Sequence, residues 1–137
     1  MQGRRMHQDG AVSMDIFLQD FADAPADKSE AVQRVLGPYF DESRGAIITA
    51  DGDAEVYGAD DTPVNGLMFT HVTGEVAWDL MYEVAVAADW VIMPVGGPVC
   101  IVSEEQRATI REDLEDVAVV LVHSGTVLLA VATTVAG

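Results

Sequence analysis

The stretch from Thr73 to Val95, TGEVAWDLMYEVAVAADWVIMPV, decides the fold more than any other part of this chain. Its apolar residues recur at intervals of three and four, which predicts a helix from Thr73 to about Trp90 that is buried over most of its surface. Two rows carry this pattern: Val76, Leu80, Val84 and Ala87, and Trp78, Met81, Ala85 and Ala88. Thr73 is the expected N-cap. A strand at 91–95 follows at once, so the helix is expected to pack on a sheet.

Short apolar, β-branched runs predict further strands on both sides of this stretch. They lie at residues 14–21, 46–50, 54–58, 66–72, 99–102 and 117–123. The DGD sequence at 51–53 is typical of a hairpin turn between two of them. The loop PVGGPVC at 94–100 is interpreted as a turn as well, because its prolines and glycines interrupt an extended pattern.

Capping boxes predict two more helices, at 27–36 (Asp27 with Glu30) and at 103–113 (Ser103 with Gln106). Gly37-Pro38 is expected to end the first of them. The last segment, 126–136, fits either a strand or a helix. We favour a helix capped by Ser124, because LLAVA has good helix formers and no alternation of polar and apolar residues.

These elements predict an α+β or α/β fold, with a mixed sheet of about 5–6 strands covered by 3–4 helices. Residues 14–137 are expected to form a single domain, and residues 1–13 a disordered leader without the apolar core of a secretory signal. Residues 117–136 carry no formal charge, but polar residues interrupt them and no Lys, Arg or aromatic belt flanks them. A cytoplasmic protein with no membrane contact is therefore expected.

Charge is the strongest signal in the composition. Acidic residues number 23 against 7 Lys and Arg, which gives a formal net charge of −16. Nucleic acids and anionic membranes need cationic contacts, so neither is an expected partner. A field of this sign favours a basic protein partner and speeds its encounter. Solubility alone is the other explanation of the charge, and the oligomeric state is left open.

Two groups of carboxylates are candidates for binding such a partner. Glu75, Asp79 and Glu83 recur every four residues and so share one stripe of the predicted helix. The second group crowds the end of the helix predicted at 103–113 and consists of Glu112, Asp113, Glu115 and Asp116. Both groups fit a solvated surface as well as a docking site. A non-catalytic interaction protein, in the form of an immunity or antitoxin-like inhibitor, is the favoured function.

The alternative is a small enzyme or ligand-binding domain that uses Cys100, the chain's one cysteine, with His71 or His123. A reactive thiolate needs an electropositive setting, whereas Cys100 has apolar neighbours and two glutamates nearby. We therefore expect a buried structural cysteine and favour a protein that is not an enzyme. The histidine spacing predicts no metal site, and no motif indicates a cofactor.

Overall fold

The computed structural model describes residues 15–20, 26–61, 63–110 and 118–136, so the leader expected at 1–13 lies outside the described residues. Within them the chain forms one open mixed sheet and three α-helices. The strands are β1 (Ile16–Gln19), β2 (Phe40–Asp41), β3 (Ala46–Ile48), β4 (Asp53–Tyr57), β5 (Gly66–Thr70), β6 (Val91–Pro94), β7 (Val99–Ile101) and β8 (Val119–Leu121). The helices are α1 (Ser29–Leu36), α2 (Val76–Ala88) and α3 (Gly125–Ala136), with 3₁₀ turns η2 (Gly37–Tyr39) and η3 (Glu104–Thr109).

The sheet has eight strands in the order β2-β3-β4-β5-β1-β6-β7-β8. All neighbours are antiparallel except β7 and β8, which are parallel. The predicted α+β class, with a mixed sheet covered by helices, is confirmed. The predicted number of about 5–6 strands was too small: every run predicted as a strand pairs in the sheet, and the two-residue strand β2 is added to them.

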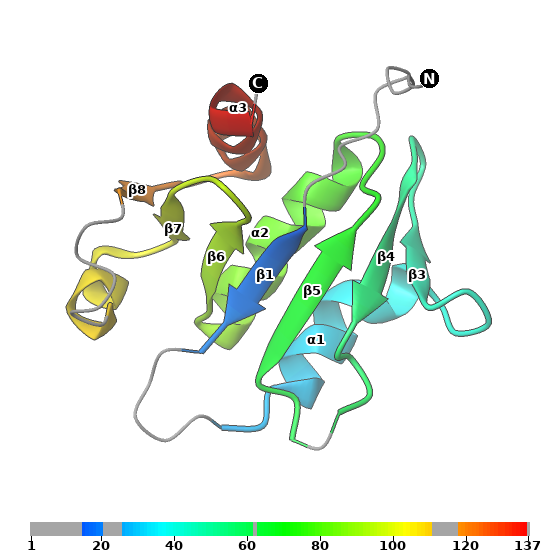
Figure 1. Cartoon of the computed structure of the whole chain (residues 1–137). Coiled ribbons are helices and arrows are strands. Elements are labelled where there is room, and N and C mark those ends of the chain that lie inside the picture. Colours follow the sequence, from blue (N-terminus) through cyan, green and yellow to red (C-terminus); the bar gives the residue numbers. More distant parts are fainter. Residues whose placement is uncertain (1–14, 21–25, 62, 111–117, 137) are drawn as a thin grey trace.

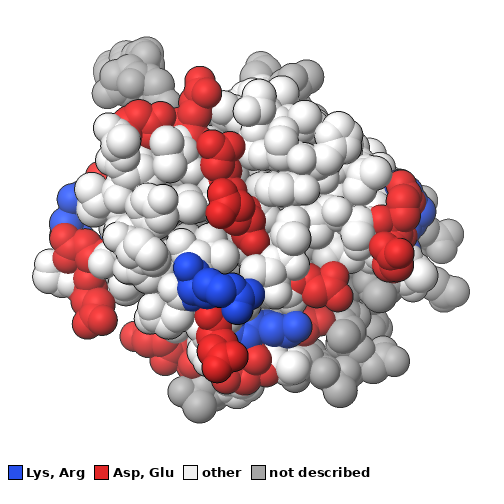
Figure 2. Space-filling view, turned by 180° about the vertical axis from the view of Figure 1, so that it is seen from behind, with Lys and Arg blue, Asp and Glu red and all other residues white. Residues whose placement is uncertain are grey.

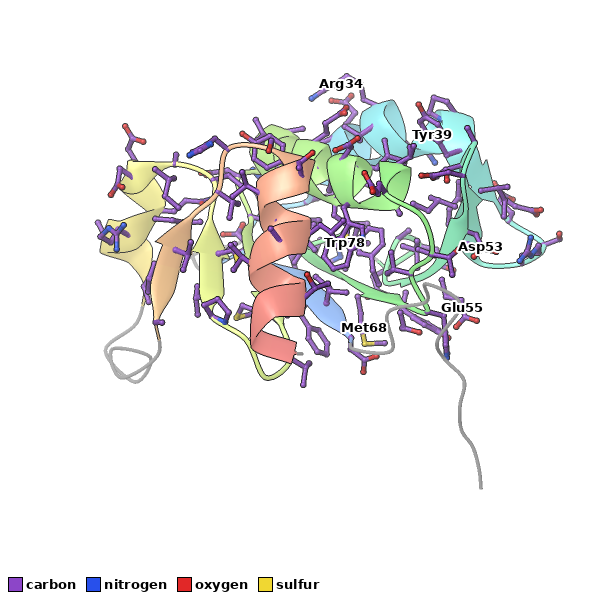
Figure 3. The ribbon with its side chains drawn as sticks, turned by 90° about the horizontal axis from the view of Figure 1, so that it is seen from above. Arg34, Tyr39, Asp53, Glu55, Met68 and Trp78 are labelled. Carbon is purple, nitrogen blue, oxygen red and sulfur yellow. The ribbon has the colours of Figure 1, made fainter. Side chains whose placement is uncertain are left out.

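Two helices cover one face of this sheet. Figure 1 shows α1 and α2 behind the strands, with α3 nearly end-on at the top of the view, above β6. Alternate strand residues point toward the helices, and they form the core with α2. Its largest fully buried side chains include Ile16, Leu18, Phe69, Trp78 and Met81. In Figure 3, Trp78 lies between α2 and the sheet, whereas Glu55 and Met68 lie on the opposite face.

The prediction of an α-helix at 103–113 is wrong for residues 103–110, the part that the structure describes. The chain there forms η3, a 3₁₀ helix, and Ser103 makes no side-chain cap. Gln106, the other member of the predicted capping box, is buried instead. Its amide donates to the Trp90 carbonyl and to Asp89, and its oxygen accepts the N–H of Val102. Gln106 therefore ties η3 to the end of α2 rather than opening an α-helix.

Three other local predictions need correction. Val119–Leu121 is half-buried rather than buried, because β8 lies at the edge of the sheet. Lys28, not Asp27, precedes α1, and the Asp27 carboxylate accepts the N–H groups of both Ser29 and Val64. Thr73 does not cap α2, whose N-cap residue is Glu75. By contrast, the final segment is a helix, and the Ser124 hydroxyl accepts the N–H of Val127 at 3.1 Å, as predicted.

α3 begins in direct contact with α2. A Cβ at Gly125 would lie within 2.5 Å of the Asp79 backbone nitrogen, and it would also overlap the Asp79 Cα and carboxylate. Backbone atoms of a helix cannot move aside as a flexible side chain can. Glycine at this position therefore allows the two helices to cross closely.

We predict that Gly125→Ala lowers the free energy of unfolding by about 1–3 kcal/mol, the usual cost of forcing extra atoms into a packed contact. Urea unfolding of the full chain measures this change. Thr126→Ala, at the exposed next position of α3, is the matched control and should change stability by less than about 0.5 kcal/mol. Equal stability of the two variants would contradict the close crossing.

Candidate functional site

Glu75, Asp79 and Glu83 are all exposed, and they lie at intervals of four along α2. Seen from the helical side, the molecule carries a line of acidic side chains, with basic side chains gathered at its lower end (Figure 2). We call these three residues the α2 stripe. The second predicted group, Glu112, Asp113, Glu115 and Asp116, lies outside the described residues.

Packing fixes which side of α2 faces the solvent. Seven of its residues are buried: Ala77, Trp78, Leu80, Met81, Val84, Ala85 and Ala88. α1 and α3 both pack against this helix, and the sheet lies beneath it. The narrow sector that remains carries the α2 stripe together with Val86, which is 51% exposed. The direction of the stripe is therefore set by the core and not by the carboxylates.

The turn between β3 and β4 caps the start of α2. One carboxylate oxygen of Asp51 accepts the N–H of Glu75 at 2.8 Å, and the other accepts the N–H of Val76 at 3.3 Å. The Thr49 hydroxyl donates to the same carboxylate at 3.1 Å, which orients it. These contacts satisfy amides that a helix leaves unpaired at its N-terminus. A side chain 24 residues away thus supplies the cap that Thr73 was expected to provide.

Thr73 instead joins the entry of α2 to β4. Its backbone N–H donates to the Asp53 carbonyl at 2.8 Å, and its hydroxyl oxygen accepts the Asp53 N–H at 2.9 Å. Gly74 lies so close to Asp51 that an added Cβ would come within 2.6 Å of the Asp51 carbonyl. The predicted hairpin at DGD is confirmed, and it holds α2 in place.

Of the three residues considered for catalysis, Cys100, His71 and His123, the cysteine is fully buried in the main core. Burial raises the pKa of its thiol to about 11. Its Sγ lies 3.8 Å from the Pro98 carbonyl, and no hydrogen bond joins it to His71 or His123 in the described part of the chain. Both histidines are exposed, His71 after β5 and His123 before α3. The structure does not bring the three residues together.

His71 has partners that the sequence did not indicate. Its Nδ1 lies 2.7 Å from the Thr70 hydroxyl and 3.2 Å from a Glu55 oxygen, and the Tyr57 hydroxyl donates to that oxygen at 3.0 Å. The Tyr57 hydroxyl first, and then His71, hold the pKa of Glu55 below its usual value. His71 has φ 53°, which is uncommon outside glycine. Strand alternation predicts that Glu55 and Tyr57 share one face of the sheet. The sequence does not show that Thr70 and His71 lie beside them, because this depends on the β4–β5 register, in which Glu55 pairs with Thr70.

We predict that Asp51→Ala lowers the midpoint of urea unfolding at neutral pH. The N–H of Glu75 is the main cause that lowers the pKa of Asp51. A carboxylate with a lowered folded pKa stabilises the protein above its unfolded pKa and loses this effect as the pH falls through the folded value. The difference between the variant and the native chain should therefore shrink in acid.

Asp61→Ala, in an exposed loop, is the control and should leave the midpoint unchanged at neutral pH. If Asp51→Ala behaved like this control, or if its effect persisted undiminished at about pH 2, well below the usual carboxyl pKa, the cap would contribute nothing through its charge.

We also predict that native Cys100 reacts with a disulfide reagent at neutral pH far more slowly than the same thiol in urea. A pKa of about 11 leaves little thiolate, and a fully buried sulfur requires opening of the structure before it reacts. Absorbance of the released thiolate reports the rate. Equal rates in buffer and in urea would show a reactive, accessible thiol and restore the catalytic hypothesis.

No helix within the described ranges is long and apolar enough to cross a membrane. The same residues contain no group of three or more His, Cys, Asp and Glu side chains placed to hold a metal ion. Comparisons with protein-family models, with curated protein sequences and with solved structures gave no significant match.

Proposed function

We propose that this chain is a non-catalytic interaction protein that binds a basic protein partner through the α2 stripe. The observation that carries the proposal is the exposure of three carboxylates, Glu75, Asp79 and Glu83, in line on a helix that packing buries over most of its other faces. Like charges four residues apart disfavour an isolated helix. Here tertiary packing holds them together on a fixed scaffold.

The charges of the stripe are also left available. None of the three carboxylates forms an ion pair with Lys or Arg in the described residues, whereas Asp53 pairs with Arg44 and Glu104 pairs with Arg107. A cationic surface would therefore gain new ion pairs without breaking existing ones. Its arrival would also relieve the mutual repulsion of the stripe.

An immunity or antitoxin-like inhibitor in the cytoplasm is the concrete form of this proposal, because such a protein needs an acidic surface and no catalytic group. The net charge of −16 supports it by steering a basic partner toward the chain. The same charge opposes nucleic acid and anionic membranes. The alternative that uses Cys100 gains no support from its buried position.

The test compares partner capture by the native chain with capture by a variant carrying Glu75→Lys, Asp79→Asn and Glu83→Lys. Asparagine at 79 keeps the size and shape of the aspartate side chain, which lies against Gly125. We expect the variant to associate more slowly with the basic protein recovered by the native chain, and to show a weaker dependence of the association rate on salt. Stopped-flow or surface-based kinetics measure both quantities.

A second variant with the same change in charge is the control: Glu30→Lys, Asp61→Asn and Glu105→Lys. These residues are exposed and lie outside α2. The proposal requires the control to retain most of the native association rate. If both variants associate with the partner equally slowly, net charge alone drives binding. If neither does, the α2 stripe is not the site.

A further inference from the structure

A surface pocket of about 460 Å³ opens on the helical side of the sheet, between α1 and the strands β2 to β4. Its size lies at the lower end of the range for sites that enclose small ligands. α1 forms one wall, and the β2–β3 turn and the loop after β4 form the others. Its lining includes the apolar residues Val32, Leu36, Phe40 and Val56 and the acidic residues Glu42 and Asp60.

The pocket has an apolar floor. Val32, Leu36 and Val56 are buried core residues, and Phe40 and Ala59 are half-buried beside them. Such a floor is suited to a hydrocarbon stem, which leaves water when it binds. The floor belongs to the main core and is therefore a preformed surface.

The polar side chains of the pocket are negative or neutral. Glu42 and Asp60 supply two exposed carboxylates, and Ser29 and Gln33 add oxygen atoms from α1. No Lys or Arg lines the pocket. Arg44, two residues from Glu42, is paired with Asp53 at 3.1 Å. The charge of the lining is thus complementary to a cation.

Hydrogen-bonded turns order the backbone at Glu42 and at Asp60. In the β2–β3 turn the Asp41 carboxylate accepts the N–H and hydroxyl of Ser43, and the Asp41 carbonyl accepts the N–H of Gly45. Asp60 lies in a turn closed by the N–H of Asp61 donating to the Gly58 carbonyl. These turns place Glu42 and Asp60 beside the same apolar floor.

We propose that this pocket binds an arginine side chain presented by the basic partner. The guanidinium donates five N–H groups, enough for two carboxylates from separate loops, and its methylene stem fits the apolar floor. The inference rests on the proposed function for the source of the arginine, but the pocket and the α2 stripe are separate sets of residues. It adds a specific anchor to a general electrostatic attraction.

The test uses N-acetyl-arginine methylamide as the probe, followed by amide chemical shifts of the full chain. The neutral citrulline analogue has nearly the same shape and serves as the ligand control. We expect saturable shifts at Gly37, Gly45 and Ala59 with the arginine probe alone. The double variant Glu42→Gln and Asp60→Asn should bind the arginine probe with an affinity at least about tenfold lower, because charge-assisted hydrogen bonds are lost.

Two further variants distinguish binding of the probe in the pocket from its attraction by the net negative charge. Glu30→Gln with Asp61→Asn removes the same charge outside the pocket lining and should bind the probe as the native chain does. Ala59→Phe keeps both carboxylates but fills the pocket, and should abolish the local shifts. Two results would overturn the inference. The citrulline analogue would bind as tightly as the arginine probe, or the Glu30 and Asp61 variant would lose as much affinity for the arginine probe as the Glu42 and Asp60 variant does.

The outcome also distinguishes this inference from the proposed function. The α2 stripe variant should still bind the arginine probe in the pocket, because none of its three residues lines it. If the native chain fails to bind the probe while partner capture still depends on the α2 stripe, the pocket inference alone fails. If the probe binds but partner capture ignores the stripe, the proposed function alone fails.

Discussion

The burial of α2 against the sheet and between its two neighbouring helices is the constraint on which the rest of this structure depends. Trp78, Met81 and Val84 are at most 1% exposed, so this helix cannot rotate without opening the core. Gly125 brings α3 against its first turn, and Asp51 fixes its start. The direction in which the α2 stripe faces is therefore set by the packing of the helix, and the carboxylates of the stripe contribute little to that packing.

Local patterns in the sequence were sufficient for much of this fold. The two apolar rows predicted α2, and Ser124 and the lack of alternation predicted α3, because both signals act within a few residues. The sequence could not show that Asp51 would cap α2 or that Gln106 would enter the core, because those contacts join residues 24 and 16 positions apart. The strand β2 was missed since two residues form no periodic pattern. For the candidate site, helical spacing predicted the stripe, whereas the pocket needs three segments that only the folded chain brings together.

The helical side of the molecule combines the two features that bear on function. The α2 stripe offers exposed carboxylates on a rigid helix, and the pocket beside α1 offers carboxylates over an apolar floor. α1 and α2 pack side by side, so both features belong to the same side of the sheet (Figures 1 and 2). Long-range attraction toward the first and anchoring in the second are distinct physical contributions: the former governs the rate of association and is weakened by salt, and the latter governs dissociation. The opposite face carries Glu55, labelled in Figure 3, and with it the hydrogen-bonded Tyr57 and His71.

Zero-length coupling of carboxylates to lysine amines, applied to the native complex, tests whether the α2 stripe touches the partner. The reaction joins only groups that touch, and mass spectrometry of the joined peptides names the carboxylates. If the α2 stripe binds the partner, Glu75 and Glu83 are coupled to partner lysines, and high salt during complex formation suppresses this coupling. Coupling confined to the opposite face, at Asp53 or Glu55, with the α2 stripe unmodified, would contradict it.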